Sequence, residues 1–338
     1  MILYDGIIFA LQMHGGISVL FNELFMRHDS GSFKIIDLNN TVPRNILNGT
    51  RIHQPSRIME RYRTALVGED FDIFHSTFYR LPSSGSSKIV TTVHDYTYER
   101  FSDRFRKTVH SWQKNKAIAG SNVVICVSES TRRDLLEFSK FRDETKIVVV
   151  YNGVSNNYEV LPTIKVTSQV LFVGSRRGYK NFDSVVYAIA GVPEVELVCV
   201  GGGSFTTSEL NLLNENIPNR YRHRRFLTNT ELNIEYNQSL CLIYPSLYEG
   251  FGIPVLEAMR AGCPVIAVNT SSIPEVAGDA SILMEIGDSD EIRKAVESLL
   301  VDETRNKLVE RGLRQSALFS WDKTYLNTMA VYEKLLLT

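Results

Sequence analysis

Short hydrophobic runs alternate with segments of helical periodicity along the whole chain. In the first half, β-branched residues are concentrated in runs that predict strands, and four stretches between the runs have the apolar spacing of helices. The predicted strands are ILYDG, FKIIDLN, FDIFHST, KIVTTVHD, NVVICVS and KIVVVYN, and the predicted helices are residues 17–27, 55–67, 104–119 and 130–141. Strands that alternate with helices favour a parallel sheet covered by helices on both faces.

The alternation stops between residues 152 and 169, where Asn, Gly, Ser, Pro and Thr predominate, and this composition predicts a linker. It then restarts with QVLFVGS and continues through VELVCVGGG, HRRFL, LCLIYPS, CPVIAVN and SILMEI. We therefore predict two doubly wound α/β domains, residues 1–153 and 166–320. The tail is helical with a break at FSWDK, so the last helix, residues 322–338, is expected to pack back on the first domain.

Composition narrows the functional classes. The chain has 338 residues, of which 43% are hydrophobic and 22% charged, so it is globular and long enough for two cores. No run approaches the roughly 20 apolar residues of a membrane span, and the start lacks the basic region of a signal peptide, so a cytoplasmic location is expected. A net charge of −1 gives no support for a nucleic-acid partner. The four cysteines, Cys126, Cys199, Cys241 and Cys263, have neither zinc nor disulfide spacing and are interpreted as reduced residues. Three of the four lie in apolar runs.

The segment EGFGIPVLEAM follows the strand LCLIYPS and contains the most specific chemistry of the chain. Gly250 and Gly252 allow a ligand to approach the backbone closely, and the unpaired amides of the helix that starts there favour a phosphate. Glu249 and Glu257 each offer a carboxylate that accepts two hydrogen bonds from a sugar diol. In isolation, the two glutamates would be interpreted as solvated residues stabilised by the helix dipole.

EGFGIPVLEAM resembles the signature of family 4 glycosyltransferases, a retaining group with the GT-B fold, in which two glutamates bracket the donor site. The segment FVGSRRGYKN, residues 172–181, resembles the same family. There Lys180 with Arg176 or Arg177 could neutralise a diphosphate leaving group in place of a metal ion. The family's basic residue directly after the glycine is replaced by Ser175, which leaves the role of Arg176 open.

The first domain carries two further segments of this resemblance, HGGIS at residues 14–18 and TTVHDYTYERF, which places His94 at the end of a strand. The resemblance implies that a glycine turn and this histidine face the donor across a central cleft. Without the resemblance, His94 would be interpreted as a structural histidine, with Asp95 orienting its ring. The three glycines 201–203 lack the downstream acidic residue of a dinucleotide site, so NAD is not expected.

The resemblance implies catalytic roles for His94, Lys180, Glu249 and Arg176 and no metal ligand. The donor contacts that it implies are Gly15, Gly16, Ser175, Arg177, Asn181, Leu227, Tyr248, Gly250, Phe251, Gly252, Ile253 and Glu257.

The expected function is retaining, metal-independent transfer of a hexose from a GDP- or UDP-sugar to a glycan or lipid-linked acceptor. The first domain would bind the acceptor, and the second would bind the donor. The resemblance favours a role in bacterial polysaccharide or O-antigen assembly, and the most similar family members are mannosyltransferases. Two alternatives stay open: an epimerase or hydrolase of nucleotide sugars, and a non-catalytic subunit that binds them. The basic stretch 100–116 either packs on the core or contacts anionic lipid at the inner face of the membrane. The residues do not distinguish the base, the sugar, the acceptor or the oligomeric state.

Overall fold

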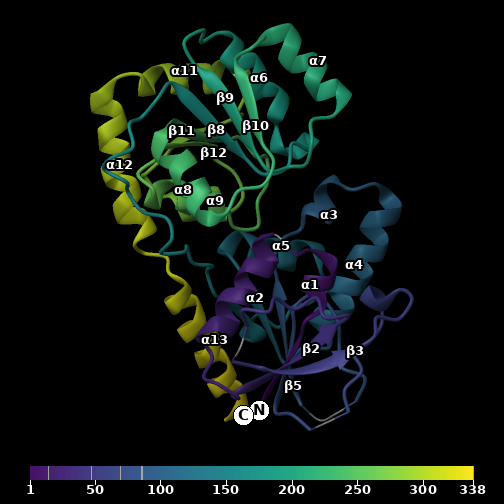
Figure 1. The fold of residues 1–338 in the computed structure, drawn as a ribbon. Coiled ribbons are helices and arrows are strands. Elements are labelled where there is room, and N and C mark those ends of the chain that lie inside the picture. The colour runs from purple at the N-terminus through teal and green to yellow at the C-terminus, as the bar shows by residue number, and fades with distance from the viewer. Residues whose placement is uncertain (14, 47, 69, 85–86, 338) are drawn as a thin grey trace. The chain divides into compact units, whose positions relative to one another are not determined.

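The chain folds into two compact α/β units in the computed structural model, which describes residues 1–13, 15–46, 48–68, 70–84 and 87–337. The first unit comprises Met1–Gly153 and Trp321–Thr338, and the second comprises Val154–Ser320. Figure 1 shows that each unit contains its own sheet with helices around it. The second unit begins inside the stretch predicted as a linker.

The sheet of the first unit has the strand order β3-β2-β1-β4-β5-β6-β7, and neighbouring strands run parallel. Its strands are β1 (Ile2–Asp5), β2 (Phe33–Leu38), β3 (Thr50–Gln54), β4 (Ile73–Ser76), β5 (Lys88–Val93), β6 (Val123–Cys126) and β7 (Ile147–Val149). Its helices are α1 (Ile7–Leu11), α2 (Gly16–Arg27), η1 (Glu60–Tyr62), α3 (Thr97–Phe101), α4 (Arg104–Ala119), α5 (Glu129–Phe138), η2 (Glu144–Lys146) and α13 (Trp321–Leu336).

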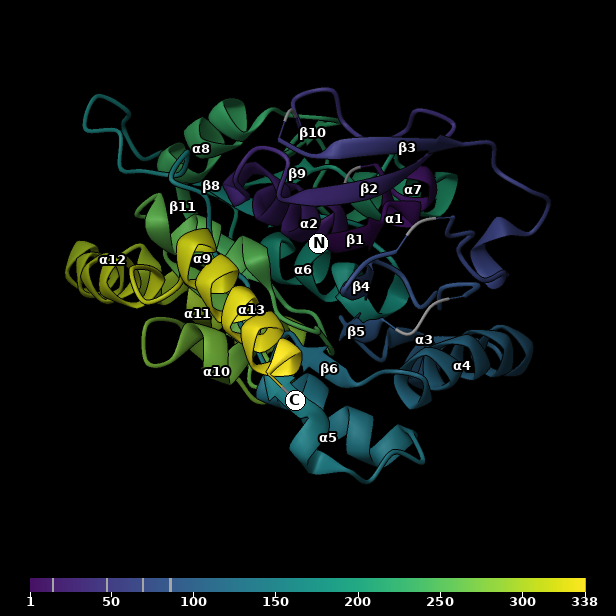
Figure 2. The same cartoon turned by 90° about the horizontal axis from the view of Figure 1, so that it is seen from below.

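The C-terminal helix α13 belongs to the first unit and packs beside α2. The buried hydroxyl of Tyr332 in α13 donates a hydrogen bond to the hydroxyl of Tyr4 in β1 at 3.0 Å, and Tyr332 also contacts His75 in β4. Trp321, at the start of the helix, is fully buried. These contacts fix the end of the chain against the first sheet. Figure 2 shows α13 from below.

The sheet of the second unit has the order β10-β9-β8-β11-β12-β13, again with parallel neighbours. Its strands are β8 (Gln169–Val173), β9 (Glu196–Val200), β10 (Tyr221–Arg224), β11 (Ser239–Tyr244), β12 (Val265–Val268) and β13 (Ile282–Met284). Its helices are η3 (Gly178–Lys180), α6 (Phe182–Ala190), α7 (Thr207–Asn216), α8 (Asn229–Gln238), α9 (Ile253–Arg260), α10 (Ile273–Ala277), α11 (Ser289–Leu299) and α12 (Asp302–Ser316). The prediction of two doubly wound parallel sheets is confirmed.

Two local predictions are wrong. The strand β3 was not predicted because its sequence, TRIHQ, is polar and lies at the partly exposed edge of the sheet. The helix predicted over residues 55–67 is a loop with the single turn η1. There Met59 adopts a left-handed φ of 60°, and the guanidinium groups of Arg57 and Arg80 bond the carbonyl of Thr64, at 2.7 Å and 3.4 Å.

None of the described helices combines the length and the apolar character needed to cross a bilayer.

Candidate active site

The loops that carry the predicted donor residues lie at the carboxyl edge of the second sheet, on either side of its switch point. From β8 the chain moves outward to β9 on one side, whereas β11 continues to β12 on the other. In open parallel sheets, the crevice at such a switch point is where ligands bind. The loop after β8 carries Lys180, and the loop after β11 carries Glu249, so both reach this edge.

Lys180 and Glu249 form an ion pair through the Nζ and Oε1 atoms. Their side chains are 12% and 14% exposed, which makes the pair accessible but largely desolvated. The amide of Leu247 donates to the carbonyl of Tyr179 at 2.9 Å, so the two loops are also joined through their backbones. Burial alone would lower the pKa of Lys180, but the charge of Glu249, the nearby Tyr244 and Tyr179 and the hydrogen bond to Glu249 together outweigh burial and raise that pKa, so Lys180 is a cation at neutral pH.

The loop after β11 is braced by the loop after β12. The hydroxyl of Ser271 accepts from the amide of Glu249 at 2.9 Å, and the hydroxyl of Ser272 donates to the carbonyls of Glu249 and Phe251 at 3.0 and 2.9 Å. Gly252 then caps α9 with a φ of 101°, in space where a Cβ atom would lie 2.9 Å from Ile273. A rigid turn of this kind presents the helix start to the switch point.

The start of α9 leaves a backbone donor available. Pro254 has no amide hydrogen, and the amide of Val255 donates to the carbonyl of Gly252 at 3.0 Å. Within the described part of the chain, the amides of Gly252 and Ile253 donate no hydrogen bond. Because the positive end of the helix dipole lies at these amides, they can bind an anion.

Glu257 lies about one turn further along α9 and is half-buried. Its Oε2 atom accepts a hydrogen bond from the hydroxyl of Tyr236 in α8 at 3.0 Å, and Tyr158 also interacts with this carboxylate. Burial raises the pKa of Glu257 from 4.5 to about 7, although both tyrosine hydroxyls oppose this shift. The carboxyl group is therefore poised between its protonated and ionised forms near neutral pH.

The guanidinium of Arg176 donates its hydrogen bonds to acceptors within the second unit. Its side chain is 2% exposed, and its Nε atom donates to Glu209 at 3.0 Å. Its Nη atoms donate to the carbonyls of Gly201 at 3.0 Å and Gly203 at 2.9 Å, with longer bonds to Gly202 and Ser204. The three glycines all have left-handed φ values, between 72° and 77°, which glycine adopts readily, and the bonds from Arg176 hold the loop after β9 in this conformation.

Arg177 has the opposite environment, since its side chain is exposed and forms no ion pair with any described residue. It lies three positions before Lys180, at the N-cap of η3. Ser175 is half-buried in the same loop. Asn181, in a left-handed conformation with a φ of 56°, donates to the carbonyl of Gly287 at 2.7 Å and therefore acts in the loop structure.

The remaining predicted donor residues of the second unit lie in the loop after β11, at the start of α9 and in the loop before α8. Gly250 is buried in the turn before α9, and Tyr248 and Phe251 beside it have exposed fractions of only 3% and 4%. Ile253 is half-buried at the first position of α9. Leu227 is half-buried in the loop between β10 and α8, away from the two central loops in sequence.

In the first unit, the predicted residues also lie at carboxyl ends of strands or at a helix start. Gly15 caps α2 and Gly16 begins it, whereas His14 of the same motif lies outside the described residues. His94 directly follows β5 and is 7% exposed, and its Nε2 atom has no hydrogen-bond partner among the described residues. Burial lowers the pKa of His94 to about 4, Asp95 opposes this and Lys114 adds to it, so the imidazole is neutral at pH 7.

The structure adds residues that the sequence did not indicate. Tyr158 and Tyr236 contact Glu257 from segments that lie far from the glutamate motif. Ser271 and Ser272 brace the loop of Glu249 from beyond the next strand. Serines directly after an apolar strand are a weak signal for such bracing, and no pattern in the sequence points to the two tyrosines.

The described residues contain no group of three or more His, Cys, Asp or Glu side chains placed to hold a metal ion.

Comparison with known proteins gives a family match for each of the two units. The model of "Glycosyl transferases group 1" matches residues 158–315, and the model of "Glycosyltransferase Family 4" matches residues 23–157. The O-antigen chain mannosyltransferase B of Escherichia coli is 26% identical over 303 residues, which are 82% of this chain and 79% of that protein.

Solved structures agree with this fold. A sucrose-phosphate synthase from Thermosynechococcus elongatus superposes with a TM-score of 0.78 at 16% identity, covering 99% of both chains. HepE from Anabaena, solved in complex with UDP-glucose, superposes with a TM-score of 0.77 at 15% identity, covering 98% of this chain and 99% of that one. At these identities, the likenesses establish the fold.

Proposed function

This chain belongs to family 4 of the glycosyltransferases, and on that premise we propose that it transfers a hexose from a nucleotide-diphosphate sugar, with retention of anomeric configuration and without a metal ion. The observation that carries the proposal is the pairing of Lys180 with Glu249 beside the free amides at the start of α9. A fixed cation, a carboxylate and a helix N-terminus at one switch point match the chemistry of a sugar diphosphate.

The donor is assigned to this site in three parts. The amides of Gly252 and Ile253 and the ammonium of Lys180 would bind the diphosphate, with Arg177 as the second cation. We reassign Arg176 from the leaving group to the glycine loop, because all three of its nitrogen atoms donate to acceptors of the second unit. Glu257 in its ionised form would accept hydrogen bonds from the ribose diol, and Glu249 would hold hydroxyls of the sugar.

In the transfer step, the bond between the anomeric carbon and the phosphate oxygen breaks, and negative charge develops on the diphosphate. Lys180 is already ion-paired in the structure, so donor binding would share its charge between Glu249 and the phosphate. The acceptor hydroxyl would attack from the face of the departing diphosphate, and the leaving phosphate oxygen would take its proton. Stabilising the developing charge is then the main catalytic contribution.

The first unit supplies the proposed acceptor domain and His94. A neutral imidazole with an unbonded, buried Nε2 atom can exchange a hydrogen bond with a hydroxyl without adding charge. We propose that His94 binds a hydroxyl of the reacting sugar. Its protonation would not change between pH 5 and 8, because its pKa is about 4.

The acceptor is proposed to be a glycan or a lipid-linked glycan of a bacterial surface polysaccharide. Support comes from the relative that acts as an O-antigen chain mannosyltransferase. A mannosyl donor is accordingly the first candidate, and UDP-glucose is the second because HepE of the same fold binds it.

The test is a thermal-shift and turnover screen with GDP-mannose, UDP-glucose, UDP-N-acetylglucosamine and dTDP-glucose in the presence of EDTA. One of these donors is expected to raise the melting temperature, because a ligand bound to the folded state stabilises it by mass action. Anomeric retention would be read from the product by NMR. Turnover that vanishes in EDTA and returns with Mg²⁺ would refute the metal-independent mechanism, and rapid donor consumption without acceptor would indicate a hydrolase or epimerase.

A further inference from the structure

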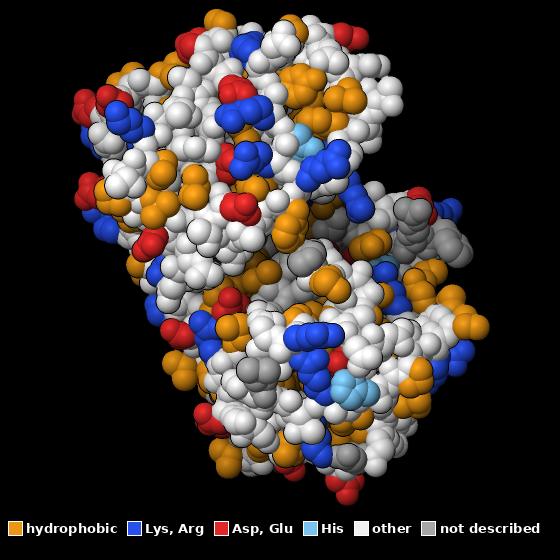
Figure 3. All heavy atoms as spheres, in the orientation of Figure 1, with side chains coloured by type: hydrophobic (Ala, Val, Ile, Leu, Met, Phe, Trp, Pro, Cys, Tyr) orange, Lys and Arg blue, Asp and Glu red, His pale blue; other side chains and the backbone are white. Residues whose placement is uncertain are grey.

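One lysine of the first unit is completely buried. Lys and Arg side chains normally lie at the surface, as those drawn in blue in Figure 3 do, but Lys114 on α4 has an exposed fraction of 0%. A buried ammonium group is costly unless its donors are bonded and its charge is balanced. The partners of Lys114 therefore indicate what a lysine does at this position.

The ammonium of Lys114 joins α4 to the loop that follows β5. Its Nζ atom donates to the carbonyl of Asp95 at 2.7 Å and to the carboxylate of Glu99 in α3 at 2.9 Å. The centroid of the Tyr96 ring lies 3.9 Å from the same atom. Two oxygen acceptors and one aromatic face account for the three N–H donors of an ammonium group, so this geometry fits the protonated form of the lysine.

Glu99 supplies the counter-charge for this lysine. Its side chain is 3% exposed and also accepts a hydrogen bond from the hydroxyl of Ser111 on α4 at 3.0 Å. Burial alone would raise the pKa of Glu99, but the neighbouring His110 and Lys114 outweigh burial and lower that pKa to about 2. The carboxylate is therefore ionised at neutral pH, and it balances the charge of the ammonium group.

The loop that Lys114 holds begins with His94, the residue directly before Asp95. The ring of His94 donates a hydrogen bond to the backbone of Thr77 after β4, and its Nε2 atom has no hydrogen-bond partner among the described residues. Phe21 of α2 packs edge-on against this ring, with 6.1 Å between the centroids. Because the ring is neutral at pH 7, the nitrogen that bonds Thr77 carries the proton, and Nε2 is left as an acceptor.

The charged groups around His94 act on it in opposite directions. Burial lowers the pKa of His94 to about 4, Asp95 raises that pKa, and Lys114 lowers it further. His75 on β4 and Tyr79 after β4 also face this ring, and burial keeps both of them neutral: it lowers the pKa of His75 to about 3 and raises that of Tyr79. Lys114 therefore holds the loop and also disfavours protonation of the ring.

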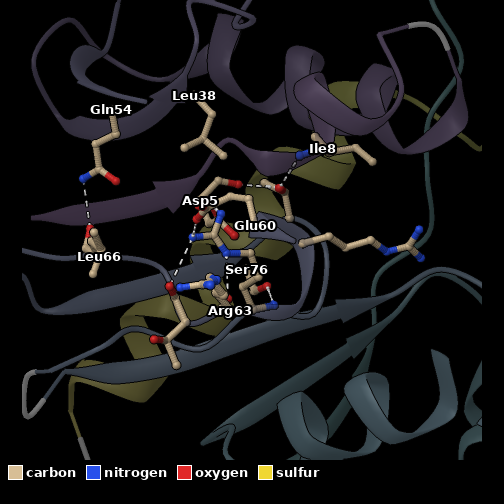
Figure 4. A network of polar contacts seen from close by, with 12 residues as sticks. Asp5, Ile8, Leu38, Gln54, Glu60, Arg63, Leu66 and Ser76 are labelled. Atoms are coloured by element: carbon tan, nitrogen blue, oxygen red, sulfur yellow. Dashed lines mark hydrogen bonds and ion pairs between the residues drawn. The ribbon is translucent and has the colours of Figure 1, made fainter. Parts of the chain in front are cut away.

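The helix that carries Lys114 is itself anchored. Gln113, the preceding residue, is buried and donates to the carbonyl of Arg61. Arg61 follows Glu60, whose carboxylate accepts from the fully buried Arg80 at 2.8 Å in the network that Figure 4 shows. These contacts give α4 a fixed position from which Lys114 can hold the loop after β5.

We propose that Lys114 is a positioning residue for His94: with Glu99 as its counter-ion, it fixes the peptide directly after His94 and keeps the Nε2 atom available to accept a hydrogen bond from a sugar hydroxyl. Lys114 acts through the backbone that it bonds and through the charge that it places behind the ring. The inference rests on the proposed role of His94 for its effect on turnover, whereas its effect on the ring can be measured without any enzyme activity.

The test replaces the buried pair by uncharged side chains of similar size, in the double variant Lys114→Met, Glu99→Gln. Removing both charges leaves no unpaired charge in the core, so the fold is expected to persist, and a melting curve checks this. The matched control is Lys116→Met, which makes the same substitution at an exposed lysine two positions further along α4. The control should leave the ring, the turnover and the melting temperature unchanged.

An NMR titration of protein labelled at the imidazole carbons measures the ring directly. The chain has seven histidines, and the spectrum of His94→Gln identifies the signal of His94. In wild type this signal should remain that of the neutral ring between pH 5 and 8, because the pKa of His94 is about 4. In the double variant, the measured pKa of His94 should rise by about one pH unit, because the nearby cation is gone.

Turnover measured in two backgrounds separates positioning from general structural support. In the wild-type background, the double variant should lower turnover about tenfold and leave the KM for the donor within about threefold. In the His94→Ala background, the same two substitutions should lower turnover by about twofold or less, because effects that pass through one residue are not additive.

Two results would overturn the proposal: a double variant, shown folded by its melting curve, in which the pKa of His94 is unchanged, or one that lowers turnover equally in both backgrounds. If His94→Ala itself leaves turnover at the level of wild type, the proposed role of His94 fails. The NMR titration alone then decides whether Lys114 governs the ring.

Discussion

Replacing Lys180 by alanine removes the one cation that the structure pairs with Glu249 at the switch point. The proposed function predicts a loss of transition-state stabilisation, because no other described side chain forms an ion pair with this glutamate. A preorganised donor aimed at developing charge contributes about 3 kcal/mol, which corresponds to a fall of roughly a hundredfold or more in turnover. Glu249→Ala should cause a loss of similar size.

Lys180→Ala is also expected to lower the stability of the fold. This effect is separate from the loss of turnover and has a smaller consequence. The lost hydrogen bond between charged groups is expected to reduce the unfolding free energy by roughly 1.5–3 kcal/mol, since the pair is only 12% and 14% exposed. The fold should persist, because the backbone bond between Leu247 and Tyr179 still joins the two loops.

The assay is steady-state transfer at saturating donor, so that turnover is measured instead of affinity, together with a melting curve of each variant. The matched control is Lys307→Ala, which breaks an ion pair with Glu303 in the same unit at 2.6 Å whose side chains are 65% and 77% exposed. An exposed pair of this kind contributes little, so turnover and melting temperature should stay near those of wild type. Turnover of Lys180→Ala within threefold of wild type would refute the assignment of Lys180 to the leaving group.

Three further predictions concern Glu257, the two arginines Arg176 and Arg177, and His94. The folded pKa of Glu257 is raised from 4.5 to about 7, so the contribution of its protonated carboxyl to stability is complete below pH 4.5 and is lost as pH rises through 7. In denaturant titrations, wild type should therefore lose about 3 kcal/mol of unfolding free energy over this range relative to Glu257→Gln. Equal pH slopes for the two proteins would contradict the burial of this carboxyl. In calorimetry, donor affinity of wild type should rise over the same pH range, because the ionised form accepts the ribose diol, and Glu257→Gln should not show that rise. Arg177→Ala should lower turnover at least tenfold with an unchanged melting temperature. Arg176→Ala should instead lower the melting temperature, because the carbonyls of Gly201 and Gly203 lose their donor. The reverse pattern would show that Arg176, and not Arg177, stabilises the leaving group. The folded pKa of His94 is depressed from 6.5 to about 4, so the contribution of its neutral imidazole to stability is present above pH 6.5 and is lost as pH falls toward 4. His94→Ala should reduce turnover at least tenfold without altering the pH profile of turnover between pH 5 and 8. A profile that changes in this range would show that His94 titrates in the reaction.

The alternation of apolar runs and helical segments was sufficient to predict both parallel sheets, because buried parallel strands require continuous hydrophobic residues. It missed β3, whose polar residues Thr50–Gln54 pair only along one edge. It also placed a helix over residues 55–67, where the ion pairs of Arg57, Glu60 and Arg80 outweigh local helix propensity. The ion pair between Glu60 and Arg80 joins positions 20 residues apart, and no periodicity indicates it.

Part of the candidate site could likewise be predicted from the sequence, and part could not. Lys180, Glu249 and Glu257 could be selected from the sequence because the segments FVGSRRGYKN and EGFGIPVLEAM resemble family 4 glycosyltransferases. Their position after apolar strands alone would have indicated solvated loop and helix-start residues. Whether an arginine faces a ligand or the protein depends on which carbonyls surround it, and the glycine loop that surrounds Arg176 comes from a different strand. The same limit explains why Tyr158 and Tyr236 were not predicted beside Glu257.

The most direct measurement is a crystal structure of the protein with GDP or UDP, whichever gives the larger thermal shift, grown in EDTA. The account predicts phosphate oxygens within hydrogen-bonding distance of the amides of Gly252 and Ile253 and of Lys180, with the ribose hydroxyls on Glu257. A nucleotide bound elsewhere, or phosphates that contact neither Lys180 nor the start of α9, would contradict it.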